Sequence, residues 1–160
     1  MLGIIESPKW ERRLDNAYIE CGPVATLIPD TISFAVDRDG CRVFCIYDAK
    51  YYVPSLGGKM EGQPGLESVT KQFLYQSAYK GFVLDHEFDY VVNAFLVPTA
   101  SDELQELARV SFPKVMGEVE PPLSNYVHMW ALPADEVFDA YLRGEKIDAG
   151  VMRAIWENGE

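Results

Sequence analysis

The feature that most constrains the fold is the nearly continuous apolar run from Cys41 to Ala49, which contains Asp48 near its end and is followed by Lys50. A run of this length predicts a buried β-strand. Side chains alternate across a strand, so Asp48 and Lys50 are expected to point to the same face. Burying a carboxylate and an ammonium is costly unless each has a partner. A metal ion and a phosphate would supply both partners.

A second strand is predicted over Thr26 to Val36, and a turn follows over Asp37 to Gly40. Asp-Gly between two apolar segments is a strong β-hairpin signal. The segment from residue 26 to residue 49 is therefore expected to form an antiparallel hairpin, with the charged strand end lying beside the beginning of the first strand.

The register of this hairpin decides which residue lies beside Asp48. If the two-residue turn is Asp39-Gly40, Asp30 lies opposite Ala49, and if the turn begins one residue earlier, Asp30 lies opposite Tyr47. Facing Cβ atoms across a strand pair are roughly 5 Å apart. Either register therefore brings the Asp30 carboxylate close to Asp48.

The rest of the chain alternates between helical and extended patterns. Val53 to Gly65 is rich in glycine and proline and is expected to be a loop, and Gly81 is expected to end the helix that follows it. The patterns predict helices over 10–17, 66–79, 102–110 and 133–142, strands over 88–98 and 125–132, and a short helix near the C-terminus. This order indicates an α/β fold with a mixed central sheet flanked by helices.

The helix expected over 66–79 carries two different stripes. Val69 and Phe73 belong to an apolar face at helical spacing. Gln72, Gln76 and Tyr79 lie at i, i+4 and i+7 and form a separate stripe. We expect at least one of the two glutamines to face the charged strand end.

Length and charge limit the classes of protein to which the chain can belong. The 160 residues suffice for a single domain over 1–160, with a core over about 8–132 and a C-terminal helical extension over 133–160. No stretch approaches the ~18–20 apolar residues of a membrane span, and the N-terminus lacks the shape of a signal peptide, so we expect a cytoplasmic protein. The net charge of -11 disfavours independent DNA binding. A nucleic-acid substrate would therefore be held by another domain or subunit.

The predicted cluster of Asp30, Asp48 and Lys50 suits phosphodiester hydrolysis. Mg²⁺ prefers oxygen ligands and typically takes one or two carboxylates besides waters and phosphate oxygens. It polarises the scissile phosphate and activates the attacking water. Lys50 is placed to stabilise developing negative charge or to orient that water, and the backbone carbonyl of Ala49 is a further candidate ligand. We expect Mg²⁺ as the cofactor, with Mn²⁺ as a substitute.

Pro29-Asp30 followed by Asp48-Ala49-Lys50 resembles the PD-(D/E)xK nuclease motif, with the gap crossing a hairpin as in that superfamily. The flanking sequence is more specific than the motif. Trp10-Glu11, Thr26 to Asp30, Asp48 to Tyr52, Thr70 to Tyr75 and Asn93 to Pro98 occur in order. Together they resemble the nuclease region of the LlaJI-family restriction endonucleases, which are related to McrC. The resemblance covers roughly residues 8 to 100.

This resemblance implies roles and partners that the residues alone do not. Many superfamily members carry a glutamine on the helix after the Asp-x-Lys strand, and Gln72 and Gln76 both match in place. The family's nuclease subunit works with a McrB-like AAA+ GTPase that translocates DNA, and it usually has an N-terminal DNA-recognition domain. Relatives often place a glutamate on a helix before the first core strand. Upstream of Asp30 there are only Glu6, Glu11 and Glu20, so we expect that helix to precede Met1 and the chain to be a fragment or a split subunit.

The sequence therefore favours a metal-dependent DNA endonuclease domain of a modification-dependent or type II-like restriction system. Asp30 and Asp48 are expected to bind metal, Lys50 to serve the water and the transition state, and Gln72 or Gln76 to orient the site. Two strands must be cut, so a homodimer is expected to meet at the DNA. Two alternatives stay open. One is a different PD-(D/E)xK nuclease, of the resolvase or repair type, which works without a GTPase motor. The other is a non-catalytic docking module that keeps the nuclease fold.

Overall fold

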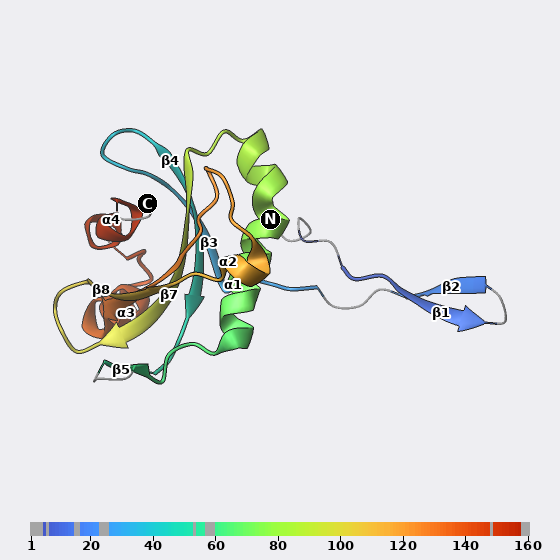
Figure 1. Cartoon of the computed structure of the whole chain (residues 1–160). Coiled ribbons are helices and arrows are strands. Elements are labelled where there is room, and N and C mark those ends of the chain that lie inside the picture. The colour runs from blue at the N-terminus through green and yellow to red at the C-terminus, as the bar shows by residue number, and fades with distance from the viewer. Residues whose placement is uncertain are drawn as a thin grey trace.

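A five-stranded mixed sheet forms the centre of the computed structural model (Figure 1). The structure describes residues 5, 7–14, 17–22, 26–52, 54–56, 60–147 and 149–157. The strand order is β3-β4-β7-β9-β8. The three central strands are parallel, and the edge strands β3 and β8 are antiparallel to their neighbours. The expected α/β fold with a mixed sheet is confirmed.

The strands of this sheet are β3 (Thr31–Val36), β4 (Arg42–Ala49), β7 (Tyr90–Thr99), β8 (Gln105–Val110) and β9 (Val127–Pro133). The helices are α1 (Leu66–Asp85), α2 (Pro113–Met116), α3 (Ala134–Arg143) and α4 (Ala149–Glu157). Two smaller pairs complete the elements, namely β1 (Trp10–Leu14) with β2 (Ala17–Cys21), and β5 (Ser55–Leu56) with β6 (Met60–Glu61). The latter pair lies inside the segment that was expected to be a loop.

The β3–β4 hairpin closes through a longer turn than the Asp-Gly signal predicts. The last pair in the register is Val36 with Arg42, so five residues connect the strands. One Asp37 carboxylate oxygen accepts the backbone N–H groups of Asp39 at 2.9 Å and Cys41 at 2.8 Å. An aspartate that satisfies two turn N–H groups favours this wider loop. Both two-residue turns are therefore wrong.

The proximity of Asp30 to Asp48 survives this correction. Strand β3 begins at Thr31, not at Thr26, and Thr31 pairs with Tyr47. Asp30 therefore lies one step beyond the last pair, at the level of Asp48. The observed register falls between the two alternatives, and each of them misplaced Asp30 by only one residue.

The sheet is covered on both faces (Figure 1). On β4, Phe44 and Ile46 pack in a cluster with residues of α1, whereas Val43, Cys45 and Tyr47 pack in a cluster with Ile155 of α4. Each face of the strand is therefore buried, which explains its continuous apolar sequence.

Helix α4 is held against the far face of β4 by apolar and polar contacts. The Ile155 side chain is fully buried, and Trp156 Nε1 donates a hydrogen bond to the Tyr47 hydroxyl at 3.0 Å. Asp48 follows Tyr47 in the strand, so its side chain lies on the opposite face, which α1 covers.

Helix α1 is longer than expected, and its buried face differs from the predicted one. It continues through Gly81 to Asp85, so Gly81 does not end the helix. Its buried residues include Gln72, Gln76 and Tyr79 together with Val69 and Phe73. The two stripes that the sequence separates thus lie in one buried interface.

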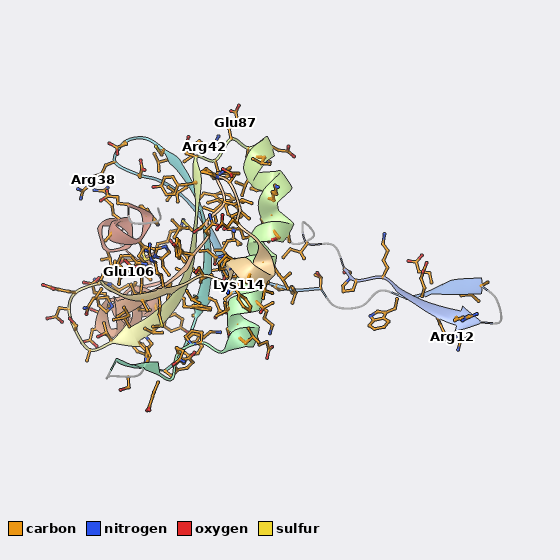
Figure 2. All side chains as sticks on the ribbon, in the orientation of Figure 1. Arg12, Arg38, Arg42, Glu87, Glu106 and Lys114 are labelled. Atoms are coloured by element: carbon orange, nitrogen blue, oxygen red, sulfur yellow. The ribbon has the colours of Figure 1, made fainter. Side chains whose placement is uncertain are left out.

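Two predicted helices are strands. Of the residues 10–17, Trp10–Leu14 form β1 and Ala17 begins β2, and residues 15 and 16 lie outside the described residues. The β1–β2 pair projects from the sheet, and Figure 2 shows Arg12 on it, away from the other elements. A helix of about eight residues is marginal without tertiary packing. Residues 105–110 form β8 because they pair with the open edge of β9, and tertiary pairing overrides a weak helical preference. None of the described helices is long and apolar enough to cross a bilayer.

Candidate active site

The carboxyl end of β4 carries an acidic and a basic side chain on one face, as predicted. Lys50 Nζ lies 2.6 Å from Asp48 Oδ1, with the Lys50 side chain 19% exposed and the Asp48 side chain 11% exposed. The Lys50 N–H donates to the Leu96 carbonyl at 2.8 Å, so the ladder with β7 continues past Ala49. The Lys50 ammonium also lies 5.6 Å from the centre of the Phe95 ring. The two charges thus form a largely buried ion pair at the carboxyl end of β4.

Asp30 reaches the main chain between these two residues. Its Oδ2 accepts a hydrogen bond from the Ala49 N–H at 3.2 Å, and the residue is exposed. The carboxylates of Asp30 and Asp48 thus approach the end of β4 from two segments, Asp30 from the residue just before β3 and Asp48 from β4 itself. The site combines one exposed and one buried carboxylate with one ammonium.

The segment that precedes Asp30 is held against α1. The Tyr75 hydroxyl donates to the Ile28 carbonyl at 3.0 Å. Burial is the main cause that raises the pKa of Tyr75, Lys71 opposes it, and the carboxylates of Asp48 and Asp30 raise it further. Tyr75 therefore lies within electrostatic reach of both candidate metal ligands.

The first turns of α1 add a second ion pair beside the site. Lys71 Nζ lies 2.6 Å from Glu67 Oε1. The hydrogen bond from Lys71 lowers the pKa of the Glu67 carboxyl, with a smaller contribution from Lys50. The same bond raises the pKa of Lys71, to which Asp48 adds. The field at the strand end thus includes charges from α1.

The two glutamines on α1 have different surroundings. Gln76 Nε2 donates to the Ser124 carbonyl at 2.8 Å, and Gln76 Oε1 accepts from the Ser124 N–H at 3.0 Å. Its amide therefore fastens the segment before β9 to the helix. Gln72 is fully buried, and within the described residues neither of its amide atoms has a hydrogen-bond partner.

Asn93 of β7 accompanies Gln72. It is fully buried and its Nδ2 donates to the Gln72 main-chain carbonyl at 3.1 Å. In the sequence-based prediction Asn93 and Tyr75 only belong to segments that carry the family resemblance, and the pairing of Lys71 with Glu67 was not predicted. A signal for Asn93 existed, since it is the single polar residue in the apolar run from Tyr90 to Val97.

Replacing Gln76 with leucine should destabilise the fold strongly. The change removes both hydrogen bonds to Ser124 and leaves a buried N–H and a buried carbonyl without partners, which costs about 1–3 kcal/mol for each group. Urea denaturation should report the loss, with the exposed Gln105 replaced by leucine as the control and expected to stay within about 0.5 kcal/mol of the wild type. An unchanged midpoint for the Gln76 variant would contradict the fastening role.

Other reactive side chains lie outside this site. Burial raises the pKa of the Cys45 thiol to about 12, so it is not a nucleophile at neutral pH. His128 is buried with Nδ1 2.6 Å from Glu106 Oε1. His128 lies two residues before Trp130 on β9, so both side chains point to the same face. This is the face that α4 covers, opposite Asp48.

Comparison with known families gives a match over residues 3–120 to the family described as LlaJI restriction endonuclease. Among curated proteins, the chain is similar to the type II restriction enzyme BsuMI component YdjA of Bacillus subtilis (strain 168), with 32% identity over 123 residues. The aligned region covers 75% of this chain and 24% of that relative. The chain thus spans about a quarter of the length of the curated relative. No solved structure matches it.

Proposed function

Because this chain belongs to the LlaJI restriction endonuclease family, we propose that it hydrolyses DNA phosphodiesters as the metal-dependent nuclease part of a restriction system. One observation supports this most, namely the convergence of Asp30, Asp48 and Lys50 at the carboxyl end of β4. Family membership supports this class of reaction, and the charged strand end is the place that we propose for it.

The topology supports a PD-(D/E)xK assignment and kinship with McrC. An antiparallel hairpin supplies Asp30 and the Asp48-Ala49-Lys50 segment, and α1 then crosses to the parallel strand β7. In this arrangement two carboxylates and a lysine lie together at the carboxyl end of β4, on the face of the sheet that α1 covers. The motif spacing and the chain topology thus agree with each other.

The donor set fits Mg²⁺. A magnesium ion needs one or two carboxylates, and its remaining ligands are waters and phosphate oxygens. Asp30, Asp48 and the Ala49 carbonyl are the proposed ligands, because they meet at the end of β4. The described residues contain no group of three or more His, Cys, Asp and Glu side chains in a metal-binding arrangement. Asp48 Oδ1 supports this assignment because it is buried and makes no hydrogen bond within the described residues, although it contacts the Lys50 ammonium. When bound, the ion would polarise the scissile phosphate.

The remaining steps fall to side chains of this chain. Lys50 releases its contact with Asp48 and turns its ammonium to the phosphate, where it stabilises the charge that develops in the transition state. We assign the orienting role to Gln72 in preference to Gln76, because the Gln76 amide is bound to Ser124. Water then attacks the phosphorus from a position that Gln72 and the carboxylates define, and the bond from phosphorus to one sugar oxygen breaks. The proton that the water loses passes to solvent, and solvent protonates the departing sugar oxygen, so the products are a phosphomonoester end and a free hydroxyl end.

The acidity of the chain supports a division of labour. With a net charge of -11, this chain repels the DNA backbone, so another domain or subunit must hold the substrate. The curated relative is named as a component of its restriction enzyme, which supports a partner subunit here. We propose that this partner includes a McrB-like AAA+ GTPase, and that a second copy of this chain cuts the second strand.

Calorimetric titration with Mn²⁺ tests the proposed function without any partner. The wild-type chain should bind the ion, whereas a variant carrying both Asp30→Asn and Asp48→Asn should not. Asp89→Asn is the matched control because Asp89 lies at the opposite end of the sheet, where its carboxylate accepts the Arg42 N–H. A wild-type chain that binds no Mn²⁺ would favour the docking-module alternative. DNA cleavage that proceeds equally well without a GTPase motor would favour a nuclease of the resolvase or repair type.

A further inference from the structure

Two carboxamide side chains lie between α1 and the sheet without the partners that burial demands. Gln72 and Asn93 are both 0% exposed. Within the described residues, both atoms of the Gln72 amide and the Oδ1 atom of Asn93 lack hydrogen-bond partners. Buried polar groups are paired in the great majority of cases, so each exception calls for an explanation. Three unpaired atoms on two residues in contact indicate a site and not an isolated packing fault.

These amides lead from the core to the charged strand end. Asn93 pairs with Ile46 of β4, and Asp48 lies two residues farther along that strand on the same face. The unpaired amide atoms of Asn93 and Gln72 therefore belong to the same interface as Asp48, whose Oδ1 is paired with the Lys50 ammonium. Helix α1 and strands β4 and β7 enclose this interface.

The contact between Asn93 and the helix fixes the direction of hydrogen bonding. The Gln72 main-chain carbonyl can only accept, so the Asn93 atom 3.1 Å from it must be Nδ2. Asn93 Oδ1 is then committed as an acceptor and needs a donor. Gln72 Nε2 is an unpaired donor on the residue that Asn93 already contacts. If it serves Asn93 Oδ1, Gln72 Oε1 is left as an acceptor.

We propose that Asn93 is a positioning residue of the nuclease site. Directly or through one water molecule, its Oδ1 engages Gln72 Nε2 and sets the amide so that Gln72 Oε1 accepts a hydrogen bond from the water that attacks the phosphate beside Asp48. This inference rests on the proposed function, and it deepens that function by adding a residue that orients the nucleophile. It also explains why two costly amides are kept in an otherwise apolar interface.

The proposal predicts that Asn93→Leu impairs catalysis far more than stability. The variant loses the pairing between the two side-chain amides, while leucine fills the same apolar interface. Gln76→Leu instead loses both hydrogen bonds to Ser124, so the melting temperature of Asn93→Leu should fall less than that of Gln76→Leu. With the complete restriction complex and Mg²⁺, kcat should fall about tenfold to a hundredfold with KM unchanged, because the water is misplaced. Gln72→Leu should behave in the same way.

The side-chain NH₂ resonance of Gln72 provides a readout that does not depend on cleavage. Its signal in a ¹⁵N spectrum can be assigned from its absence in Gln72→Leu. In Asn93→Leu this resonance should shift and its exchange with solvent should change, whereas the NH₂ signal of Gln76, which is bound to Ser124, should stay in place.

Three outcomes would overturn the positioning role. They are an unchanged Gln72 NH₂ signal in Asn93→Leu, an unchanged kcat, and a loss of melting temperature as large as that of Gln76→Leu. Failure of the proposed function is distinguishable, because a wild-type complex that neither binds Mn²⁺ nor cleaves DNA removes the reaction. The NMR and melting results for the pair of amides would still stand in that case.

Discussion

Replacement of Asp48 by asparagine should lower DNA cleavage roughly a thousandfold or more. A metal ion contributes several kcal/mol of transition-state stabilisation, and each 1.36 kcal/mol corresponds to about a factor of ten in rate. Asparagine keeps the shape of the side chain but loses the charge that holds both the ion and the Lys50 ammonium. The measurement is the single-turnover cleavage rate of the complete complex at saturating Mg²⁺, beside the melting temperature of the variant.

Asp89→Asn is the control for this experiment. Asp89 resembles Asp30 in that its carboxylate accepts a backbone N–H of β4, here that of Arg42 at 2.6 Å. It lies where β4 begins, whereas Asp48 lies where β4 ends, so its variant should cleave DNA at the wild-type rate. An Asp48→Asn complex that cleaves as fast as the wild type would refute the assignment of the active site.

The second large effect is expected for Lys50→Met, and it should separate catalysis from metal binding. Methionine keeps the apolar stem that packs near Phe95 but removes the ammonium. Cleavage should fall about a hundredfold to a thousandfold, the usual cost of losing one group that stabilises transition-state charge. Binding of Mn²⁺ should be kept or become tighter, because the ammonium 2.6 Å from Asp48 Oδ1 competes with the ion for that carboxylate.

Calorimetry and cleavage must be measured on the same Lys50→Met preparation. Lys71→Met serves as the control, since Lys71 is paired with Glu67 and is expected to contribute only through the surrounding field. Its variant should change cleavage less than about tenfold. If Lys50→Met lost metal binding along with cleavage, Lys50 would have a structural role at the strand end in place of the proposed catalytic one.

The proximity of Asp30, Asp48 and Lys50 could be predicted from the sequence because a small error in strand register does not separate these residues. The apolar run before Asp48 predicts a buried strand, and the structure packs both faces of that strand. The hairpin signal misjudged the turn, yet a register error of one residue still leaves Asp30 next to Asp48. Strand alternation predicts that Asp48 and Lys50 share a face, and the structure shows them there as an ion pair.

The errors occur where local pattern and tertiary context disagree. Residues 105–110 have a helical composition but pair with the open edge of β9. The local sequence of these residues does not show that an unpaired strand edge will lie beside them. The glutamines of α1 are polar, so periodicity assigned them to a separate stripe, whereas the structure buries Gln72 and Gln76. Burial of an amide depends on a partner distant in sequence, as Ser124 is for Gln76, and spacing within the helix cannot reveal such a partner.

The five-residue turn that closes the β3–β4 hairpin has a practical consequence for handling the molecule. Strand β4 has eight residues, which at 3.3 Å per residue separate its two ends by roughly 25 Å. Asp39 and Gly40 are exposed at the turn, and loop tips of this kind accept insertions well. An affinity tag or a surface tether inserted between them would hold the protein by the end of β4 that is remote from Asp48. The carboxyl end of β4 would then stay accessible to DNA in single-molecule experiments.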